Sequence, residues 1–278
     1  MSASAGGKVS VEDVEYRRVD GQSLLARLYR PAGPGQFPGV VGIHGGAWTS
    51  GDRLQNEAID GALAAAGAVV MALDFRMPPD FPYPASVSDI NHGIRWLRAH
   101  ADTLQTRTDW IGAVGGSSGA HQMLLNLLEP DNPVYAAADI AGADARLGFA
   151  VACWPIADPV ARYRMAQERK NARLVAAHEA FFPSEQAMAK ANPQTIVERT
   201  RGSALPPLLV LQGTKDDNVT PDMAERFVTA YERAGGRAVL KTFADQPHTF
   251  VTRDPSTPAS LEALALMCDF MTSRGANI

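Results

Sequence analysis

Short apolar runs alternate with segments of helical periodicity along most of this 278-residue chain. Strands joined by helices form βαβ units, whose strands are parallel and whose helices cover both faces of the sheet. The sequence therefore predicts an α/β fold around one mostly parallel central sheet. We expect its strands at 40–43, 68–73, 110–114, 149–153, 208–211 and 238–243, and its helices at 59–66, 86–100, 119–128, 221–234 and 260–272.

The N-terminal part departs from this alternation. Residues 9–18 alternate apolar and polar side chains, Asp20-Gly21 follows, and residues 24–29 resume the apolar pattern. Two such runs around a tight turn predict a β-hairpin. With the hairpin, we expect a sheet of about eight strands.

A second departure lies at 155–206, where no convincing strand is found. Helical stretches at 161–182 and 184–191 are interrupted by prolines. A long excursion of this kind inside an α/β domain is typical of a lid over a site. We therefore expect a single domain over residues 8–278, with a lid or cap insertion at approximately 155–206 and a flexible N-terminus at 1–7.

Composition excludes several classes of protein. The formal net charge is −4 with both signs scattered, so neither a nucleic-acid partner nor a membrane surface is indicated. No run approaches the ~18 apolar residues that a membrane span requires. Cys153 and Cys268 lie in apolar patterns, are expected to be buried, and suggest neither a disulfide framework nor a metal site. Without a recognisable signal peptide, we expect a cytoplasmic protein.

The stretch GGSSG at 115–119 follows an apolar strand directly and opens a helix. This is the context of the G-x-S-x-G nucleophile elbow, in which a serine sits on a strained strand-to-helix turn. Read in this way, Ser117 is the nucleophile and the N–H of Ser118 points at the developing oxyanion. The alternative is a plain Gly/Ser loop, which the flanking strand and helix make less favourable.

A serine nucleophile needs a base that an acid holds in place. On this type of sheet both come from loops at the carboxyl ends of later strands. The stretch QGTKDDNVTPD follows the strand at 208–211, and QPHTF follows the last strand. The chain order Ser, Asp, His is the order expected for this architecture, which makes His248 the base.

Four stretches carry a resemblance to a known family: HGGAW (44–48), GGSSGAH (115–121), LDFRMPPDFPYPAS (73–86), and QGTKDDNV (212–219) followed by PHTF (247–250). With them the chain resembles α/β-hydrolases, close to the hormone-sensitive-lipase-like esterases and the acylaminoacyl- or dipeptidyl-peptidase catalytic domains. The resemblance covers nearly the whole chain. It implies an α/β-hydrolase fold with a serine nucleophile.

The resemblance also implies roles for individual residues. The first aspartate of the G-T-x-D-D-x-V pattern orients the histidine, which here is Asp216. Asp217 is then expected to hold the loop by accepting backbone N–H groups, and Gln212 to touch the strand end without reaching the triad. The second and third residues after the histidine of HGGAW donate to the oxyanion.

Those two donors are Gly46 and Ala47, and His44 is expected to orient their loop. Relatives have glycine where this chain has Ala47, so we expect the Ala47 N–H to serve as a donor if its φ is not positive.

Aromatic side chains predict the lining of the site. They follow the oxyanion loop, the strand after the elbow helix and the fourth strand, or lie in the lid, which favours an apolar or aromatic acyl pocket. The alternative is that about half of them pack the lid onto the core. The candidates are Trp48, Trp154, Phe81, Tyr83, Phe181 and Phe182.

These features predict a serine carboxylesterase that acts on small acyl or aromatic esters through an acyl-enzyme, with no cofactor and no metal. An amidase or arylformamidase with the same triad stays open, because an HGG-aromatic loop also occurs in that group. A peptidase is less favoured, because no acidic pair stands ready for a peptide N-terminus. A ligand-binding homologue without catalysis is the third alternative. The expected partner is a small ester or amide, and a homodimer is left open.

Overall fold

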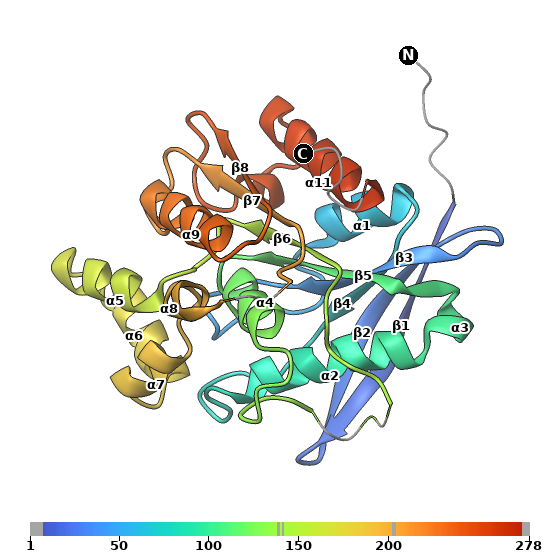
Figure 1. Cartoon of the computed structure of the whole chain (residues 1–278), viewed down its shortest axis with the longest axis horizontal. Coiled ribbons are helices and arrows are strands. Elements are labelled where there is room, and N and C mark those ends of the chain that lie inside the picture. Colours follow the sequence, from blue (N-terminus) through green and yellow to red (C-terminus); the bar gives the residue numbers. More distant parts are fainter. Residues whose placement is uncertain (1–7, 138–139, 141, 202–203, 274–278) are drawn as a thin grey trace.

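The computed structural model describes residues 8–137, 140, 142–201 and 204–273, so the predicted flexible N-terminus at 1–7 lies outside the described residues. Its centre is an eight-stranded sheet in the order β1-β2-β4-β3-β5-β6-β7-β8 (Figure 1). The predicted α/β-hydrolase fold is confirmed. The strands are β1 Val9–Val19, β2 Gln22–Pro31, β3 Phe37–Ile43, β4 Val69–Leu73, β5 Thr106–Gly116, β6 Phe149–Cys153, β7 Leu208–Gly213 and β8 Ala238–Phe243.

The sheet combines an antiparallel edge with a parallel centre. β1 and β2 form the predicted hairpin, whose turn residues Asp20 and Gly21 have φ of 50° and 75°. Two positive φ values are what a two-residue type I′ turn requires. β2 pairs antiparallel with β4, and every pair from β4 to β8 is parallel. The carboxyl ends of β3, β5, β6, β7 and β8 therefore meet at one edge.

Helices cover both faces because the parallel strands are apolar on both sides. In β4, Val69, Met71 and Leu73 join one core, while Val70 and Ala72 join the other. The first core also contains apolar residues of α2, α4 and α9, and the second contains those of α1 and α11. The helices are α1 Glu57–Ala65, α2 Ala85–Ala99, α3 Ala101–Leu104, α4 Ser118–Leu128, α9 Pro221–Arg233, α10 Phe250–Arg253 and α11 Pro258–Thr272.

Four helices fill the segment between β6 and β7 and gather at the left of the view in Figure 1. The stretch expected to be helical over 161–182 is two helices, because Lys170 has a φ of 53° and the Asn171 side chain caps the next helix at the N–H of Leu174. Positive φ ends a helix, and an asparagine cap begins one. The four are α5 Pro159–Glu168, α6 Ala172–Phe181, α7 Glu185–Lys190 and α8 Pro193–Arg199.

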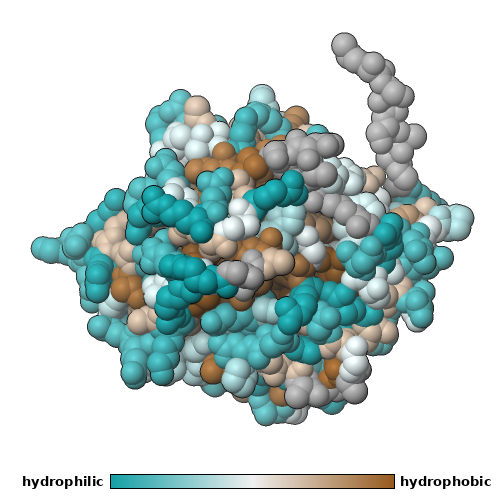
Figure 2. Space-filling view, viewed as in Figure 1, coloured by the Kyte–Doolittle hydropathy of each residue, from teal (hydrophilic) through white to brown (hydrophobic). Residues whose placement is uncertain are grey.

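The surface agrees with the composition. The face seen in Figure 2 is mostly hydrophilic, with smaller apolar areas between. Among the described helices, none is both long and apolar enough to cross a bilayer. Cys153 is buried as expected, whereas Cys268 is only partly buried, and its thiol donates to the Ala62 carbonyl of α1 at 3.5 Å.

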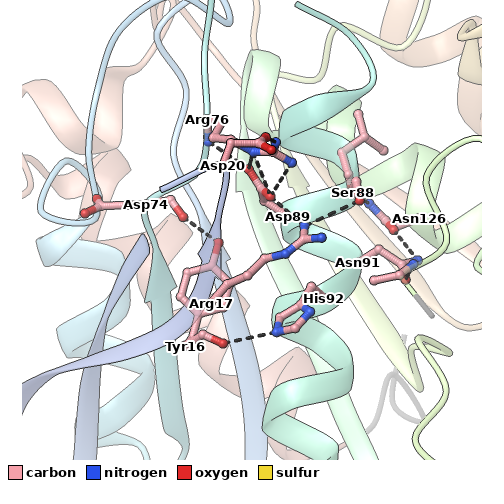
Figure 3. Close-up of polar contacts among 12 residues, drawn as sticks. Tyr16, Arg17, Asp20, Asp74, Arg76, Ser88, Asp89, Asn91, His92 and Asn126 are labelled. Carbon is pink, nitrogen blue, oxygen red and sulfur yellow. Dashed lines mark hydrogen bonds and ion pairs between the residues drawn. The ribbon is translucent and has the colours of Figure 1, made fainter. Parts of the chain in front are cut away.

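A buried carboxylate joins the hairpin and the loop after β4 to α2 (Figure 3). Asp89 of α2 accepts from Arg17 of β1 at 2.6 Å and from the Arg76 guanidinium at 3.0 Å, and its side chain has no exposed surface. The backbone N–H of Arg76 also donates to it, at 2.9 Å. This cluster fixes the entry into the loop that leads to α2.

Removing this carboxylate should destabilise the fold strongly. In Asp89→Ala, two largely buried guanidinium groups lose their shared acceptor, and breaking such a buried pair costs about 3–5 kcal/mol. Urea denaturation of the variant measures the loss. As control, Asp131→Ala removes a carboxylate that is 55% exposed and pairs with Arg146 at the surface, where little stability is expected to be lost. Equal effects in the two variants would contradict a structural role for Asp89.

Candidate active site

Ser117 occupies a sharp turn between β5, which ends at Gly116, and α4, which begins at Ser118. Its φ of 55° and ψ of −119° are unfavourable for a residue with a side chain. The Ser117 N–H donates to the Cys153 carbonyl at 2.9 Å, and the Ser117 carbonyl accepts from the His121 N–H at 3.1 Å. Neighbouring β6 and the first turn of α4 thereby hold the strained conformation in place.

The flanking glycines are required by close packing. A Cβ on Gly119 would lie 2.4 Å from the Ile43 carbonyl oxygen, and one on Gly115 would lie 2.8 Å from the Ala120 nitrogen. Real Cβ contacts of this kind do not occur, so any side chain here would push α4 away from β3. The glycines of GGSSG therefore serve the tight approach of strand, turn and helix rather than the flexibility of a loop.

The structure brings Ser117, Asp216 and His248 together. The Ser117 hydroxyl donates to Nε2 of His248 at 2.9 Å, and Nδ1–H of His248 donates to Oδ2 of Asp216 at 2.7 Å. Asp216 lies in the loop after β7 and His248 in the loop after β8, both at the carboxyl edge of the sheet. The Asp216 side chain is fully buried, and that of His248 is 12% exposed.

The surroundings of the acid correct two expectations. Gln212 reaches the triad after all, because its side chain at the end of β7 points along the loop and donates to Oδ2 of Asp216 at 3.1 Å. The backbone N–H groups of Asn218 and Val219 donate to Oδ1 of Asp216 at 2.9 and 2.8 Å, so the loop is held by Asp216. Asp217 does not have the expected role: it is exposed, and its carbonyl accepts from Arg169.

The HGGAW loop turns sharply after β3. Gly46, Ala47 and Trp48 have φ of 108°, 52° and 66°, and a Cβ on Gly46 would lie 1.9 Å from the Ser50 carbonyl oxygen. The Trp48 N–H donates to the Ser118 hydroxyl at 3.0 Å, which ties the loop to α4. At its start, Nδ1–H of His44 donates to the Gly45 carbonyl at 2.7 Å.

The positive φ of Ala47 corrects the condition set from the sequence. Rotation about φ turns the Cβ and the carbonyl of a residue around its N–Cα bond, whereas the direction of its N–H is set by the preceding peptide plane. The donor is therefore retained at the cost of backbone strain. Within the described residues, no acceptor takes the N–H groups of Gly46, Ala47 or Ser118.

A cavity of about 660 Å³ opens beside the Ser117 and His248 side chains. Gly46 and Ala47 form part of its wall, and Trp154 lies 6.3 Å from the His248 ring centre. Small and polar side chains dominate the rest of the wall, including Thr49, Ser50, Gln55, Ala176, Ala180 and Asn218.

The predicted aromatic pocket is wrong except for Trp154. Trp48, Phe181 and Phe182 are buried in a separate cluster under the helices α5 to α8, where Trp48 stacks on Phe181 at 5.1 Å. Tyr83 packs at the edge of this cluster, and Phe81 lies against the Arg76 guanidinium. For Phe181 and Phe182, the reason is the rotation of α6, which turns its aromatic end inward and its alanines toward the cavity.

Two further histidines support this cluster without entering the cavity. Nδ1 of His121 accepts from Nε1 of Trp48 at 3.1 Å, and Nε2–H of His121 donates to the Ala191 carbonyl at 2.9 Å. Burial lowers the pKa of His121 to about 4 and that of His178 to about 3, so both are neutral at neutral pH. Among the described residues, no group of His, Cys, Asp and Glu could hold a metal ion.

A serine, an aspartate and a histidine in this chain order, at the carboxyl edge of a sheet with this strand order, define an α/β-hydrolase. Comparison with known families gives the particular group. The chain belongs to the BD-FAE family, whose match covers residues 27–231.

Known proteins similar to the chain are esterases by name. The chain is 27% identical over 222 residues to the probable carboxylic ester hydrolase LipM of Mycobacterium tuberculosis. This match covers 77% of the chain and 49% of LipM. The chain spans about half the length of LipM and of the esterases LipC and LipQ of the same organism.

Solved structures cover almost the whole chain. A thermophilic esterase of Thermogutta terrifontis with bound propionate superposes with a TM-score of 0.78 at 25% identity, covering 99% of this chain and 96% of that one. An esterase of Pyrobaculum calidifontis shares the fold with a TM-score of 0.81 at 23% identity, covering 98% and 87%. The resemblance inferred from the motifs is confirmed at the level of the fold and the family.

Proposed function

We propose that the chain is a serine carboxylesterase that hydrolyses small esters through an acyl-enzyme on Ser117. The observation that carries the proposal is the unbroken series of hydrogen bonds from the Ser117 hydroxyl through His248 to Asp216, at 2.9 and 2.7 Å. The names of similar proteins, a carboxylic ester hydrolase and a thermophilic esterase, support the same reaction class.

In the first half of the reaction, Ser117 Oγ attacks the ester carbonyl while Nε2 of His248 takes the hydroxyl proton. The carbonyl oxygen becomes anionic and is stabilised by the N–H groups of Gly46, Ala47 and Ser118, which lack acceptors within the described residues. The buried Asp216 carboxylate stabilises the imidazolium and fixes its tautomer. The tetrahedral intermediate then collapses, and His248 gives its proton to the departing alcohol.

In the second half, His248 activates a water that attacks the acyl-enzyme, and the same N–H groups stabilise the second oxyanion. The imidazolium returns the proton to Ser117 as the acid product leaves. Every proton that moves passes through Nε2 of His248, and the mechanism uses no other group for this purpose.

We infer that residues 155–206 act as a cap over this site. Ala176, Ala177 and Ala180 of α6 belong to the wall of the cavity, and Arg162 of α5 contributes to it as well. Short side chains on the inner side of the cap leave room for a small substrate. The polar wall favours short acyl groups over long alkyl chains.

Parallel turnover of p-nitrophenyl butyrate and N-formylkynurenine tests the reaction class. We expect a higher kcat/KM for the ester, and among p-nitrophenyl esters we expect butyrate to exceed decanoate. Ser117→Ala serves as the blank for both substrates. A large preference for the formamide would replace the ester assignment by an arylformamidase.

A further inference from the structure

The cavity beside Ser117 carries an unusual concentration of positive charge. Arg162, Arg173 and Arg253 belong to its wall, and no aspartate or glutamate is found among the described residues of that wall. The chain as a whole has more acidic than basic residues, with a formal net charge of −4. The positive charge is therefore a local property of the site.

Arg162 is buried at the inner end of this charged group, with no exposed surface. Its Nε donates to the Asn218 carbonyl at 3.1 Å, and another nitrogen approaches Nε2 of His178 at 3.5 Å. These partners are neutral, and no carboxylate forms an ion pair with Arg162 within the described part of the chain. Asp216 lies near enough to favour its charged form but is hydrogen-bonded to His248.

The Arg162 guanidinium stays charged in spite of this burial. Desolvation and the charge of Arg173 lower its pKa to about 10, which still leaves it protonated at neutral pH. A buried cation that faces a second cation is costly unless an anion joins them. Arg162 also positions the acid loop through Asn218, so its contribution to the cavity is a fixed positive potential rather than free donors.

Arg173 and Arg253 have free guanidinium groups. Arg173 lies on the first turn of α6 and Arg253 at the end of α10, just after the loop that carries His248, and both are exposed. No hydrogen bond or ion pair to either side chain is found among the described residues. Guanidinium groups without partners are suited to bind a carboxylate in bidentate fashion.

We propose that the cavity selects esters that carry a carboxylate, which Arg173 and Arg253 bind directly at the mouth while Arg162 attracts it from within. The proposal rests on the function proposed above and names the substrate class of the same site. Opposite charge raises the rate of encounter and holds the substrate, and salt weakens both effects.

Two matched pairs of esters test the proposal. 4-Acetoxybenzoate and methyl 4-acetoxybenzoate place the charge or its neutral equivalent in the alcohol part. Monophenyl adipate and phenyl hexanoate do so in the acyl part. In at least one pair we expect the kcat/KM of the anionic ester to be about tenfold higher than that of the neutral ester, which is the effect of one charge-assisted hydrogen bond. We expect this ratio of kcat/KM values to fall as the NaCl concentration is raised.

Variants connect the preference with the arginines. Arg173→Gln and Arg253→Gln should each lower the ratio severalfold, and together bring it close to one. Arg164→Gln is the matched control, because this substitution removes the same charge. Arg164 lies on α5, is exposed and is not part of the cavity wall. The control should leave the ratio as in the wild type.

The outcomes separate the two proposals. Equal turnover of both members of each pair, or a ratio that Arg173→Gln and Arg253→Gln leave unchanged, overturns the carboxylate proposal while the esterase assignment stands. If no ester is hydrolysed, the esterase assignment fails, and calorimetry with adipate and the Ser117→Ala protein then tests the carboxylate site. Adipate binding that Arg173→Gln weakens, but Arg164→Gln does not, supports the site. No binding of adipate overturns it.

Discussion

Ser117→Ala should lower kcat for p-nitrophenyl butyrate by about 10⁵-fold or more, because the variant has no oxygen to form the acyl-enzyme. His248→Ala should cause a loss of similar size, since the hydroxyl then has no base at the 2.9 Å that separates Oγ from Nε2. The two residues act as one unit, so the double variant should be hardly worse than either single variant. Steady-state kinetics with highly purified proteins measures all three.

These losses must be chemical and not structural. Alanine at position 117 keeps the Cβ and accommodates the φ of 55° no worse than serine does, so the turn should persist. Thermal unfolding of Ser117→Ala should resemble that of the wild type. Activity within about tenfold of the wild type in either single variant would refute the assignment of nucleophile and base.

Asp216→Asn is the second substitution with a large expected effect, about 10⁴-fold in kcat. One interaction of the carboxylate explains the size. Its Oδ2 accepts the Nδ1–H of His248 at 2.7 Å, and an amide can present an N–H there, which favours the tautomer with the proton on Nε2. That tautomer cannot accept the Ser117 proton.

Asp217→Asn is the matched control for this prediction. The residue is adjacent and exposed, and it contributes its backbone carbonyl to Arg169, which asparagine retains. We expect kcat within about twofold of the wild type, as for a surface substitution away from the site. The reverse ranking of the two variants would exchange the roles of the neighbouring aspartates.

The fold could be predicted because its signal is repeated along the chain. The strands β4, β6 and β7 are each apolar on both faces, and the helices between them have one apolar side. A wrong prediction of one helix or strand therefore leaves the prediction of the others unaffected. Ser117 and His248 could be located for a related reason. Ser117 directly follows a recognisable strand, His248 lies in the loop after another, and parallel strands end at the same edge.

The lining of the site could not be predicted in the same way. Whether Phe181 or Ala177 faces the cavity depends on how α6 is rotated about its axis, and both faces of this short helix contain apolar residues. The contact of Gln212 with Asp216 depends on how the loop folds back over the end of β7. A polar side chain at the penultimate position of an otherwise apolar strand, close to the acid loop, was the available signal.

The most direct test of the account is covalent labelling with a fluorophosphonate, followed by intact mass and peptide mapping. We expect one adduct per chain, located on Ser117, and no labelling of His248→Ala on the same time scale. An adduct on another residue, or a wild-type protein that turns over esters without labelling at Ser117, would contradict the assignment of Ser117 as the nucleophile.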